Sequence, residues 1–320
     1  RYKGKYPRNY KEKYKELNPE KYQDTIEKVI RKGSTPAGMH ISIMVKEIID
    51  FLQIKPGQTG FDATLGYGGH TKAMLECLKG QGHMYATDVD PIESAKTKKR
   101  LADAGFGEDI LTIRLQNFCT IDEIAKEAGG FDFVLADLGV SSMQIDNPDR
   151  GFSFKVDGPL DLRLNPEKGI SAAERLAQIN EDELAGMLWE NSDEPYAEEL
   201  AHAIVTERKH GKPIDTTTRL REVIEETLSF LPEKEKKDTV KKTCQRTFQA
   251  LRIDVNNEFE VLYEFMEKLP GALKPGGRAA ILTFHSGEDK LVKKALKQGY
   301  KEGVYSEIAN DVVSPSAEEC

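Results

Sequence analysis

The chain has 320 residues with 46 basic and 54 acidic side chains, and the resulting net charge of −8 excludes a uniformly basic nucleic-acid binder. Hydrophobic residues make up 38% of the chain, but no uninterrupted apolar run approaches the roughly 18 residues that a membrane helix needs. The four cysteines form no C-x-x-C pair, which disfavours a structural metal or a disulfide framework and favours a cytoplasmic protein.

Residues 1–38 are predicted to form a basic arm. Residues 1–34 hold eleven Lys and Arg against five Asp and Glu, interleaved with tyrosines. A solvated arm with a short amphipathic helix over 22–32 is the simpler interpretation. The alternative is a segment that lies along RNA, because aromatic side chains stack on bases.

Strands and helices are predicted to alternate over residues 39–141. A helix over 43–52 comes first. Strands are then predicted over 60–65, 83–87, 110–115 and 131–136, and helices over 71–79, 91–104 and 121–128. This order predicts an α/β fold with a parallel, doubly wound sheet.

A helical segment interrupts this alternation. Helices are predicted over 172–179, 181–189 and 196–208, and a charged stretch follows over 232–243. The α/β pattern resumes with a long helix over 248–269 and a strand over 278–284, which follows Leu273-Lys-Pro-Gly-Gly277. We therefore predict one domain from residues 39–141 and 248–320, with a helical insertion over 142–247.

A glycine-rich loop follows the first predicted strand, with the sequence Asp62-Ala-Thr-Leu-Gly66-Tyr-Gly68-Gly69-His70. Glycines let a ligand approach the backbone, and the next helix offers free N–H groups. Asp88 ends the second strand, where a carboxylate suits a ribose diol, and Asp137 ends a later strand at the same sheet edge. For the loop alone, a tight turn without a ligand is the alternative.

The loop favours S-adenosylmethionine over a dinucleotide. The third glycine of G-x-G-x-x-G is missing, while Asp62 before the loop and the late L-x-P-G-G turn are typical of methyltransferases. No G-x-x-x-x-G-K-[ST] motif is present, which disfavours an NTPase.

With these residues assembled, the sequence resembles the ribosomal small-subunit RNA methyltransferase H family from about residue 40 to residue 289. The matching segments are Gly66-Tyr-Gly-Gly-His70, Asp88-Val-Asp-Pro91, Asp137-Leu-Gly-Val-Ser-Ser-Met-Gln144, Arg150-Gly-Phe-Ser-Phe154, Asp157-Gly-Pro-Leu-Asp-Leu-Arg163, Arg246-Thr-Phe-Gln-Ala-Leu-Arg-Ile253 and Phe284-His-Ser286. The resemblance implies a class I, Rossmann-like methyltransferase that uses S-adenosylmethionine to methylate the exocyclic N4 of a cytidine in 16S ribosomal RNA. It also implies that ribosomal RNA or the small subunit is the partner, and it allows a homodimer.

The resemblance assigns two groups of site residues. The cofactor group is Gly66, Gly68, Gly69, His70, Asp88, Phe118, Asp137 and Gln144. The catalytic group is Asp137, Ser141 and Ser142. Phe118 would border the adenine, although a core aromatic after a strand is the alternative.

Asp137, or a backbone carbonyl of Leu138 or Gly139, is the candidate acceptor for the hydrogen bonds of the substrate amine. The lone pair of a cytosine amine is delocalised into the ring, so an acceptor must align the amine as positive charge develops. We expect positioning and charge stabilisation rather than full general-base catalysis.

Four residues are candidates for substrate contact, namely Phe152, Phe154, Arg246 and His285. The two phenylalanines could sandwich a base or anchor the helical insertion. His285 could orient the substrate or act as a helix cap. Lysines and arginines over 234–252, Arg252 among them, could contact phosphates or form a solvated face.

The sequence departs from the family pattern in three places. The opening H-[ST]-P-V-L is His40-Ile-Ser-Ile-Met44, the family's H-S-L-E-D is His285-Ser-Gly-Glu-Asp289, and the chain ends without a basic tail. Gly287 is expected to loosen a packed helix start. These departures leave open a paralogue that acts on another RNA. The rival hypotheses are a non-catalytic S-adenosylmethionine-binding RNA or assembly factor, and a methyltransferase for a small molecule or a protein.

Overall fold

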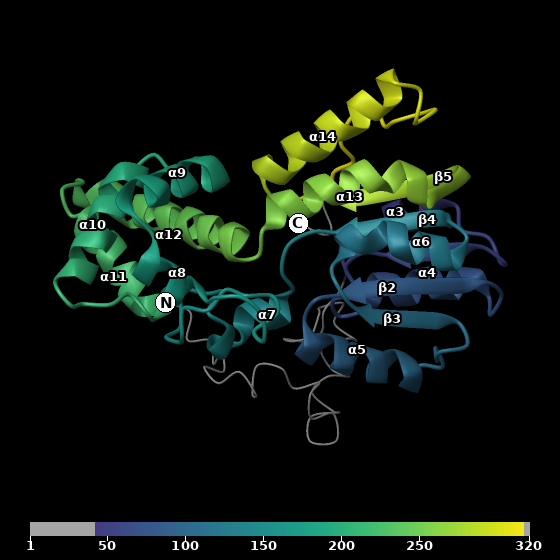
Figure 1. Cartoon of the computed structure of the whole chain (residues 1–320), viewed down its shortest axis with the longest axis horizontal. Helices are drawn as coiled ribbons and strands as arrows, with labels where there is room; N and C mark the ends of the chain where they lie inside the picture. The colour runs from purple at the N-terminus through teal and green to yellow at the C-terminus, as the bar shows by residue number, and fades with distance from the viewer. Residues whose placement is uncertain (1–41, 317–320) are drawn as a thin grey trace.

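The computed structural model describes residues 42–316, so the predicted basic arm lies outside the described residues. In Figure 1 the sheet and its helices form one lobe, and helices α8 to α12 form a second lobe beside it. Over residues 42–316, no helix is long and apolar enough to cross a bilayer.

The described part of the chain contains one sheet of five parallel strands, in the order β3-β2-β1-β4-β5. The strands are β1 (Thr59–Asp62), β2 (His83–Asp88), β3 (Leu111–Leu115), β4 (Phe131–Asp137) and β5 (Leu273–Leu282). The chain order reverses beside β1, which lies between β2 and β4. Open α/β sheets bind ligands at the carboxyl edge of such a reversal.

Helices cover both faces of the sheet, which confirms the doubly wound prediction. One face packs against α3 (Val45–Leu52), α4 (Gly69–Leu78) and α5 (Pro91–Asp103). The other packs against α6 (Ile121–Ala128) and α13 (Glu258–Ala272), and α14 (Ser286–Lys301) lies on α13.

Strand β4 contributes to both hydrophobic cores. Phe133 and Leu135 belong to the core on one face, and Phe131 and Val134 to the core on the other. Phe131 and Phe133 belong to different cores although they are only two residues apart, and the β4–β5 pairing shifts register between them. Five of the seven residues of this strand are buried, which is typical of a parallel sheet that is covered on both faces.

The second lobe has a hydrophobic core of its own, which includes Leu160, Leu200 and Leu251. Its helices are α8 (Ala172–Gln178), α9 (Glu181–Ser192), α10 (Ala197–Lys209), α11 (Thr217–Thr227) and α12 (Glu233–Val255). The short α7 (Ser142–Asp146) and the 3-10 turn η3 (Pro148–Arg150) connect β4 to this lobe. The predicted insertion boundary at 247/248 falls inside α12.

The predicted helix over 248–269 is wrong. The charged stretch 232–243 forms the first half of α12. The helical conformation is interrupted at Asn256 and Asn257, and α13 begins after them. Asn257 has a left-handed backbone with φ of 48°, which asparagine tolerates better than most residues. Apolar periodicity continues on both sides of the break, so the sequence pattern conceals it.

Candidate functional site

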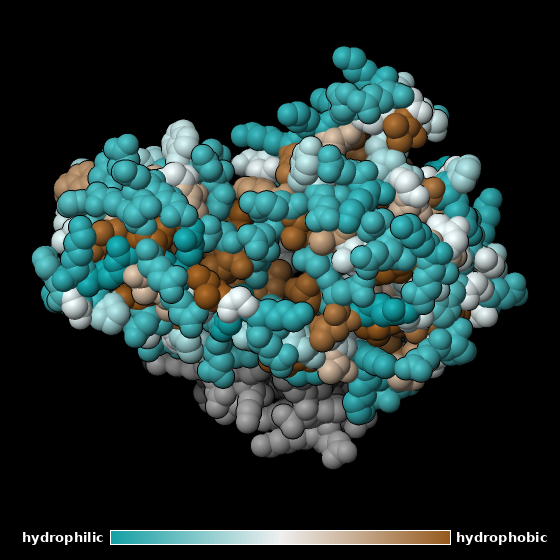
Figure 2. Space-filling view, viewed as in Figure 1, coloured by the Kyte–Doolittle hydropathy of each residue, from teal (hydrophilic) through white to brown (hydrophobic). Residues whose placement is uncertain are grey.

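A cavity of about 470 Å³ lies at the carboxyl edge of the sheet. The segments that follow β1, β2, β3, β4 and β5 line this cavity together with the corner between α12 and α13. Figure 2 shows hydrophobic residues at the surface where the two lobes meet. The predicted cofactor residues all line the cavity, namely Gly66, Gly68, Gly69, His70, Asp88, Phe118, Asp137 and Gln144.

The glycine loop has its shape because neighbouring elements pack directly against it. Gly68 has a φ of 88°, and a Cβ there would lie 2.7 Å from Cγ2 of Thr97 on α5. A Cβ on Gly69 would overlap the hydroxyl of Ser42. These two glycines are therefore required by protein packing, because a side chain at either position would clash with Thr97 or Ser42.

Asp62 is hydrogen-bonded to residues of the glycine loop and of α4, and it does not line the cavity. Its carboxylate accepts hydrogen bonds from the Thr71 hydroxyl at 2.6 Å and from the Thr64 amide at 3.0 Å. Burial raises the pKa of Asp62 to about 6. Its role is therefore to order the strand-to-helix turn.

Asp88 lies at the end of β2 and lines the cavity. Its carboxylate accepts hydrogen bonds from the amides of Gly66 at 3.1 Å and Asp90 at 2.9 Å. Burial, opposed by these hydrogen bonds, raises the pKa of Asp88 to about 6. The two amides fix the carboxylate beside the glycine loop.

Asp137 is held from two sides. Its backbone amide donates to the Thr64 hydroxyl at 2.7 Å, and its Oδ2 lies 3.4 Å from Nδ1 of His70. The other ring nitrogen of His70, Nε2, lies 2.7 Å from the carbonyl of Ile43 and must carry a hydrogen. Burial disfavours the imidazolium, but the hydrogen bonds to Asp137 and Ile43 outweigh burial and raise the pKa of His70.

Ser141 and Gln144 form the N-terminal cap of α7. The Gln144 amide N–H donates to the Ser141 hydroxyl at 3.2 Å, and the Ser141 N–H donates to the Gln144 side-chain oxygen at 3.0 Å. Ser142 is the first residue of α7 and is exposed outside the cavity. Of the serines predicted to be catalytic, only Ser141 therefore lines the cavity, and its hydroxyl caps the helix.

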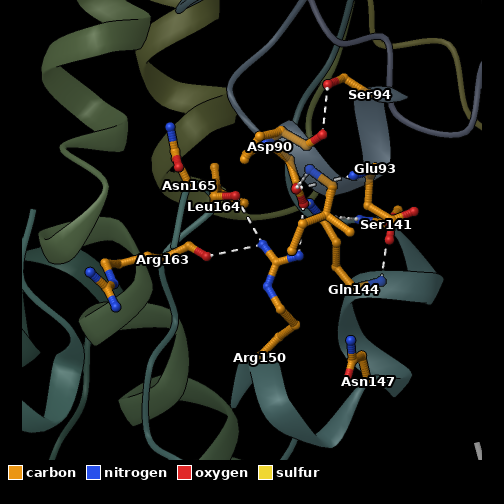
Figure 3. A network of polar contacts seen from close by, with 12 residues as sticks. Asp90, Glu93, Ser94, Ser141, Gln144, Asn147, Arg150, Arg163, Leu164 and Asn165 are labelled. Atoms are coloured by element: carbon orange, nitrogen blue, oxygen red, sulfur yellow. Dashed lines mark hydrogen bonds and ion pairs between the residues drawn. The ribbon is translucent and has the colours of Figure 1, made fainter. Parts of the chain in front are cut away.

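A buried polar network joins this cap to the second lobe (Figure 3). Oδ2 of Asp90 accepts hydrogen bonds from the Gln144 side chain at 2.8 Å and from Nη1 of Arg150 at 2.8 Å. Nη2 of Arg150 donates to the carbonyl of Leu164 at 2.9 Å. Gln144 is thus oriented by α5 and by the segment that enters the second lobe.

Three predicted substrate residues lie outside the cavity lining. Phe152 and Phe154 pack against the core of the second lobe, and the Phe154 ring meets Phe248 edge to face at 5.5 Å. Arg246 lies on α12, where its charge acts on buried Glu194. For the two phenylalanines this placement fits the anchoring alternative.

His285 lines the cavity and caps α14. Its Nδ1 accepts a hydrogen bond from the Glu288 amide at 3.4 Å, which fits the capping alternative. The expectation that Gly287 loosens the helix start is wrong. A Cβ on Gly287 would lie 2.6 Å from the ring of Phe259, so glycine permits close packing there.

The corner between α12 and α13 contributes charged residues that the sequence did not assign to the site. Arg252 and Glu258 both line the cavity, and Nε of Arg252 lies 3.2 Å from both carboxylate oxygens of Glu258. Burial, opposed by Arg252, raises the pKa of Glu258. Arg252 is therefore a mostly enclosed cavity residue, with 15% of its side chain exposed, and not part of a solvated basic face.

Comparison with known proteins shows which family the chain belongs to. The sequence profile of the MraW methylase family matches residues 37–314. The chain belongs to the MraW methylase family.

Relatives of this MraW methylase are similar over most or all of the chain. A protein of Agathobacter rectalis named ribosomal RNA small subunit methyltransferase H 1 is 82% identical over 319 residues, which cover 100% of this chain and 91% of the relative. A protein of Lachnoclostridium phytofermentans with the same name is 71% identical, covering 100% of this chain and 87% of the relative. Ribosomal RNA small subunit methyltransferase H of Thioalkalivibrio sulfidiphilus is 40% identical, covering 82% and 81%.

Proposed function

We propose that this MraW methylase transfers the methyl group of S-adenosylmethionine to the exocyclic N4 of a cytidine in small-subunit ribosomal RNA. The family membership and the names of the relatives support the methyl transfer and the class of substrate. The observation that carries the proposal is Asp137, fixed by Thr64 and His70 at the cavity end of β4.

The cavity residues suit S-adenosylmethionine. The carboxylate of Asp88 suits the ribose hydroxyls, and the half-buried Phe118 offers an apolar face to an adenine. The glycine loop leaves room for a nucleoside beside the backbone. When bound, S-adenosylmethionine supplies an electrophilic methyl group on a sulfonium.

Asp137 would accept a hydrogen bond from the substrate amine and stabilise the positive charge that develops on N4. His70 would keep this carboxylate in place, because its other nitrogen is anchored on Ile43. Residues 142–247, the proposed substrate-recognition unit, would present RNA to the opening between the lobes.

The role of Asp137 is tested with the isosteric change Asp137→Asn. An amide has half the acceptor capacity and no charge, so we expect turnover at saturating cofactor to fall by about 100-fold or more. The binding of S-adenosylhomocysteine, measured by calorimetry, separates a loss of binding from a loss of turnover. Near-normal turnover in Asp137→Ala would rule this role out.

The substrate is tested with small-subunit RNA from cells that lack the protein. We expect mass spectrometry of the digested RNA to show a loss of N4-methylcytidine, and the purified enzyme to restore it. An unchanged level would favour a paralogue with another substrate. Failure of the wild-type protein to methylate any RNA would favour the non-catalytic alternative.

A further inference from the structure

The cavity that contains Asp137 is also lined by Arg252, a guanidinium that Glu258 holds in place through its Nε. Only 15% of the Arg252 side chain is exposed, and its Nε is held by Glu258. Over residues 42–316, no protein group accepts a hydrogen bond from its two Nη groups. An arginine that lines a cavity in this state presents a planar pair of donors to a ligand.

The surroundings hold this guanidinium in one place. Asn256 accepts a hydrogen bond from the Leu164 amide at 2.8 Å and donates to the backbone carbonyl of Arg252 at 2.8 Å. Glu258 begins α13 directly after the break, and 16% of its side chain is exposed. The corner between the two helices therefore orients Arg252 from its backbone and from its side chain.

An exposed aromatic ring lies on the sheet side of the same cavity. Phe284 follows β5, is 56% exposed and lines the cavity. A Cβ on Gly139 would lie 3.7 Å from its ring, so Phe284 packs beside the loop that begins at Asp137. A large apolar side chain that is exposed at a cavity is a suitable stacking surface for an unpaired base.

We propose that Phe284 and Arg252 form the subsite for the target cytosine, with Arg252 as the specificity-determining residue and Glu258 as its positioning residue. This inference rests on the proposed function, and it identifies the residues that recognise cytosine at the proposed site of methyl transfer. The base stacks on Phe284, its N4 faces Asp137, and Arg252 donates hydrogen bonds to N3 and O2.

This arrangement discriminates between pyrimidines. Cytosine presents two acceptors, N3 and O2, which match the forked donors of an arginine. Uracil carries a hydrogen on N3, and that donor would face a second donor from Arg252. The amine of cytosine remains free to approach Asp137, because Arg252 engages the other two positions of the same edge.

The test compares variants for methylation of small ribosomal subunits from cells that lack the protein, and for binding of S-adenosylhomocysteine. Arg252→Lys keeps the positive charge but removes the planar pair of guanidinium donors. Glu258→Gln weakens the hydrogen bond that holds Nε of Arg252. We expect kcat/KM to fall by about 10- to 100-fold in Arg252→Lys, and less in Glu258→Gln. The affinity for S-adenosylhomocysteine should stay within about twofold, because neither residue contacts the cofactor in this proposal.

A matched control removes a guanidinium elsewhere in the helical lobe. Arg221 forms an exposed pair with Glu225 on α11, so Arg221→Ala should leave kcat/KM unchanged. Thermal unfolding of each variant monitors folding. If Arg252→Lys lowers cofactor affinity in parallel with kcat/KM, Arg252 serves the cofactor and the proposal is overturned.

A substrate analogue tests the contact itself. We place 3-deazacytidine, which lacks the N3 acceptor, at the mapped target of the ribosomal RNA by ligation. The wild-type enzyme should lose about tenfold in kcat/KM, and Arg252→Lys should show no further loss, because the partner is already absent. Equal losses in both enzymes would overturn the proposal. A wild-type enzyme that forms no N4-methylcytidine would instead reject the proposed function, and this inference with it.

Discussion

Three aspartates at the carboxyl edge of the sheet have different roles because their surroundings differ. Asp62 is buried under the glycine loop and accepts hydrogen bonds from two threonines. Asp88 faces the cavity while two backbone amides hold it. Asp137 lies beside His70 and is more accessible than Asp62, with 24% of its side chain exposed. The carboxylate that supports the loop is thus buried, and the proposed catalytic carboxylate is partly accessible.

Buried carboxylates also affect stability. The pKa of Asp62 and of Asp88 is about 6 in the folded protein, above the ordinary value of 3.8. Their contribution to the unfolding free energy is therefore full below about pH 4 and is lost as the pH rises through 6. A bound ligand that donates hydrogen bonds to Asp88 would offset this loss.

The pKa of Asp88 leads to a prediction about pH. Its charged form is the better acceptor for ribose hydroxyls, so protonation below pH 6 should weaken ligand binding. We expect the affinity for S-adenosylhomocysteine to fall by about tenfold from pH 7.5 to pH 5, measured by calorimetry. Asp88→Asn should bind weakly with little pH dependence over this range. If the affinity of Asp88→Asn for S-adenosylhomocysteine still falls between pH 7.5 and pH 5, another group causes the pH dependence.

At the level of elements, the corner between α12 and α13 depends on one asparagine. Asn256 accepts a hydrogen bond from the Leu164 amide and donates to the carbonyls of Leu162 and Arg252, each at 2.8 Å. These bonds join the end of α12 to a loop that begins the second lobe. Leu162 has a left-handed φ of 64°, which these contacts help to stabilise.

The change Asn256→Ala should therefore destabilise the protein. It removes the partners of several backbone groups that are half-buried or buried, and we expect the unfolding free energy to fall by about 2–4 kcal/mol in urea titration. Asn257→Gly is the matched control. Its left-handed backbone suits glycine, so its stability should be unchanged or slightly higher. Equal effects of the two changes would contradict the structural role of the Asn256 side chain.

The sequence predicted the elements whose signals are local. The apolar run of β4 and the Asp90-Pro91 start of α5 are recognisable within a few residues, and the structure places them close to the predicted bounds. The break before α13 was missed because Asn256 is held by residues more than ninety positions away. Phe154 was given a substrate role for the same reason, since its partner Phe248 is distant in the chain.

The site shows the same division. Glycine-loop residues, Asp88 and Asp137 could be predicted because each follows a strand, and parallel strands bring such positions to one edge. Arg252 and Glu258 could not, because a basic run and an acidic first turn are usual on any exposed helix. Only the corner between α12 and α13 brings this pair to the cavity.

For the whole molecule, the joint between the lobes includes a buried ion pair. Arg150 and Asp90 are 2.8 Å apart and almost completely buried, and Arg150 also binds the carbonyls of Arg163 and Leu164. Asp90 in turn caps α5, by accepting a hydrogen bond from the Ile92 amide. The orientation of the second lobe is therefore linked to the helix that packs against the glycine loop.

Loss of Arg150 should weaken this joint. Arg150→Met leaves the charge of Asp90 buried without a partner, and we expect the unfolding free energy to fall by about 3–5 kcal/mol in denaturant titration. The exposed pair of Arg114 and Glu127 supplies the control, because Arg114→Met should cost no more than about 1 kcal/mol. Asp90→Asn keeps a capping oxygen without the charge, so adding it to Arg150→Met should recover part of the loss. A double variant whose loss equals the sum of the two single losses would show that the two charges do not interact across the joint.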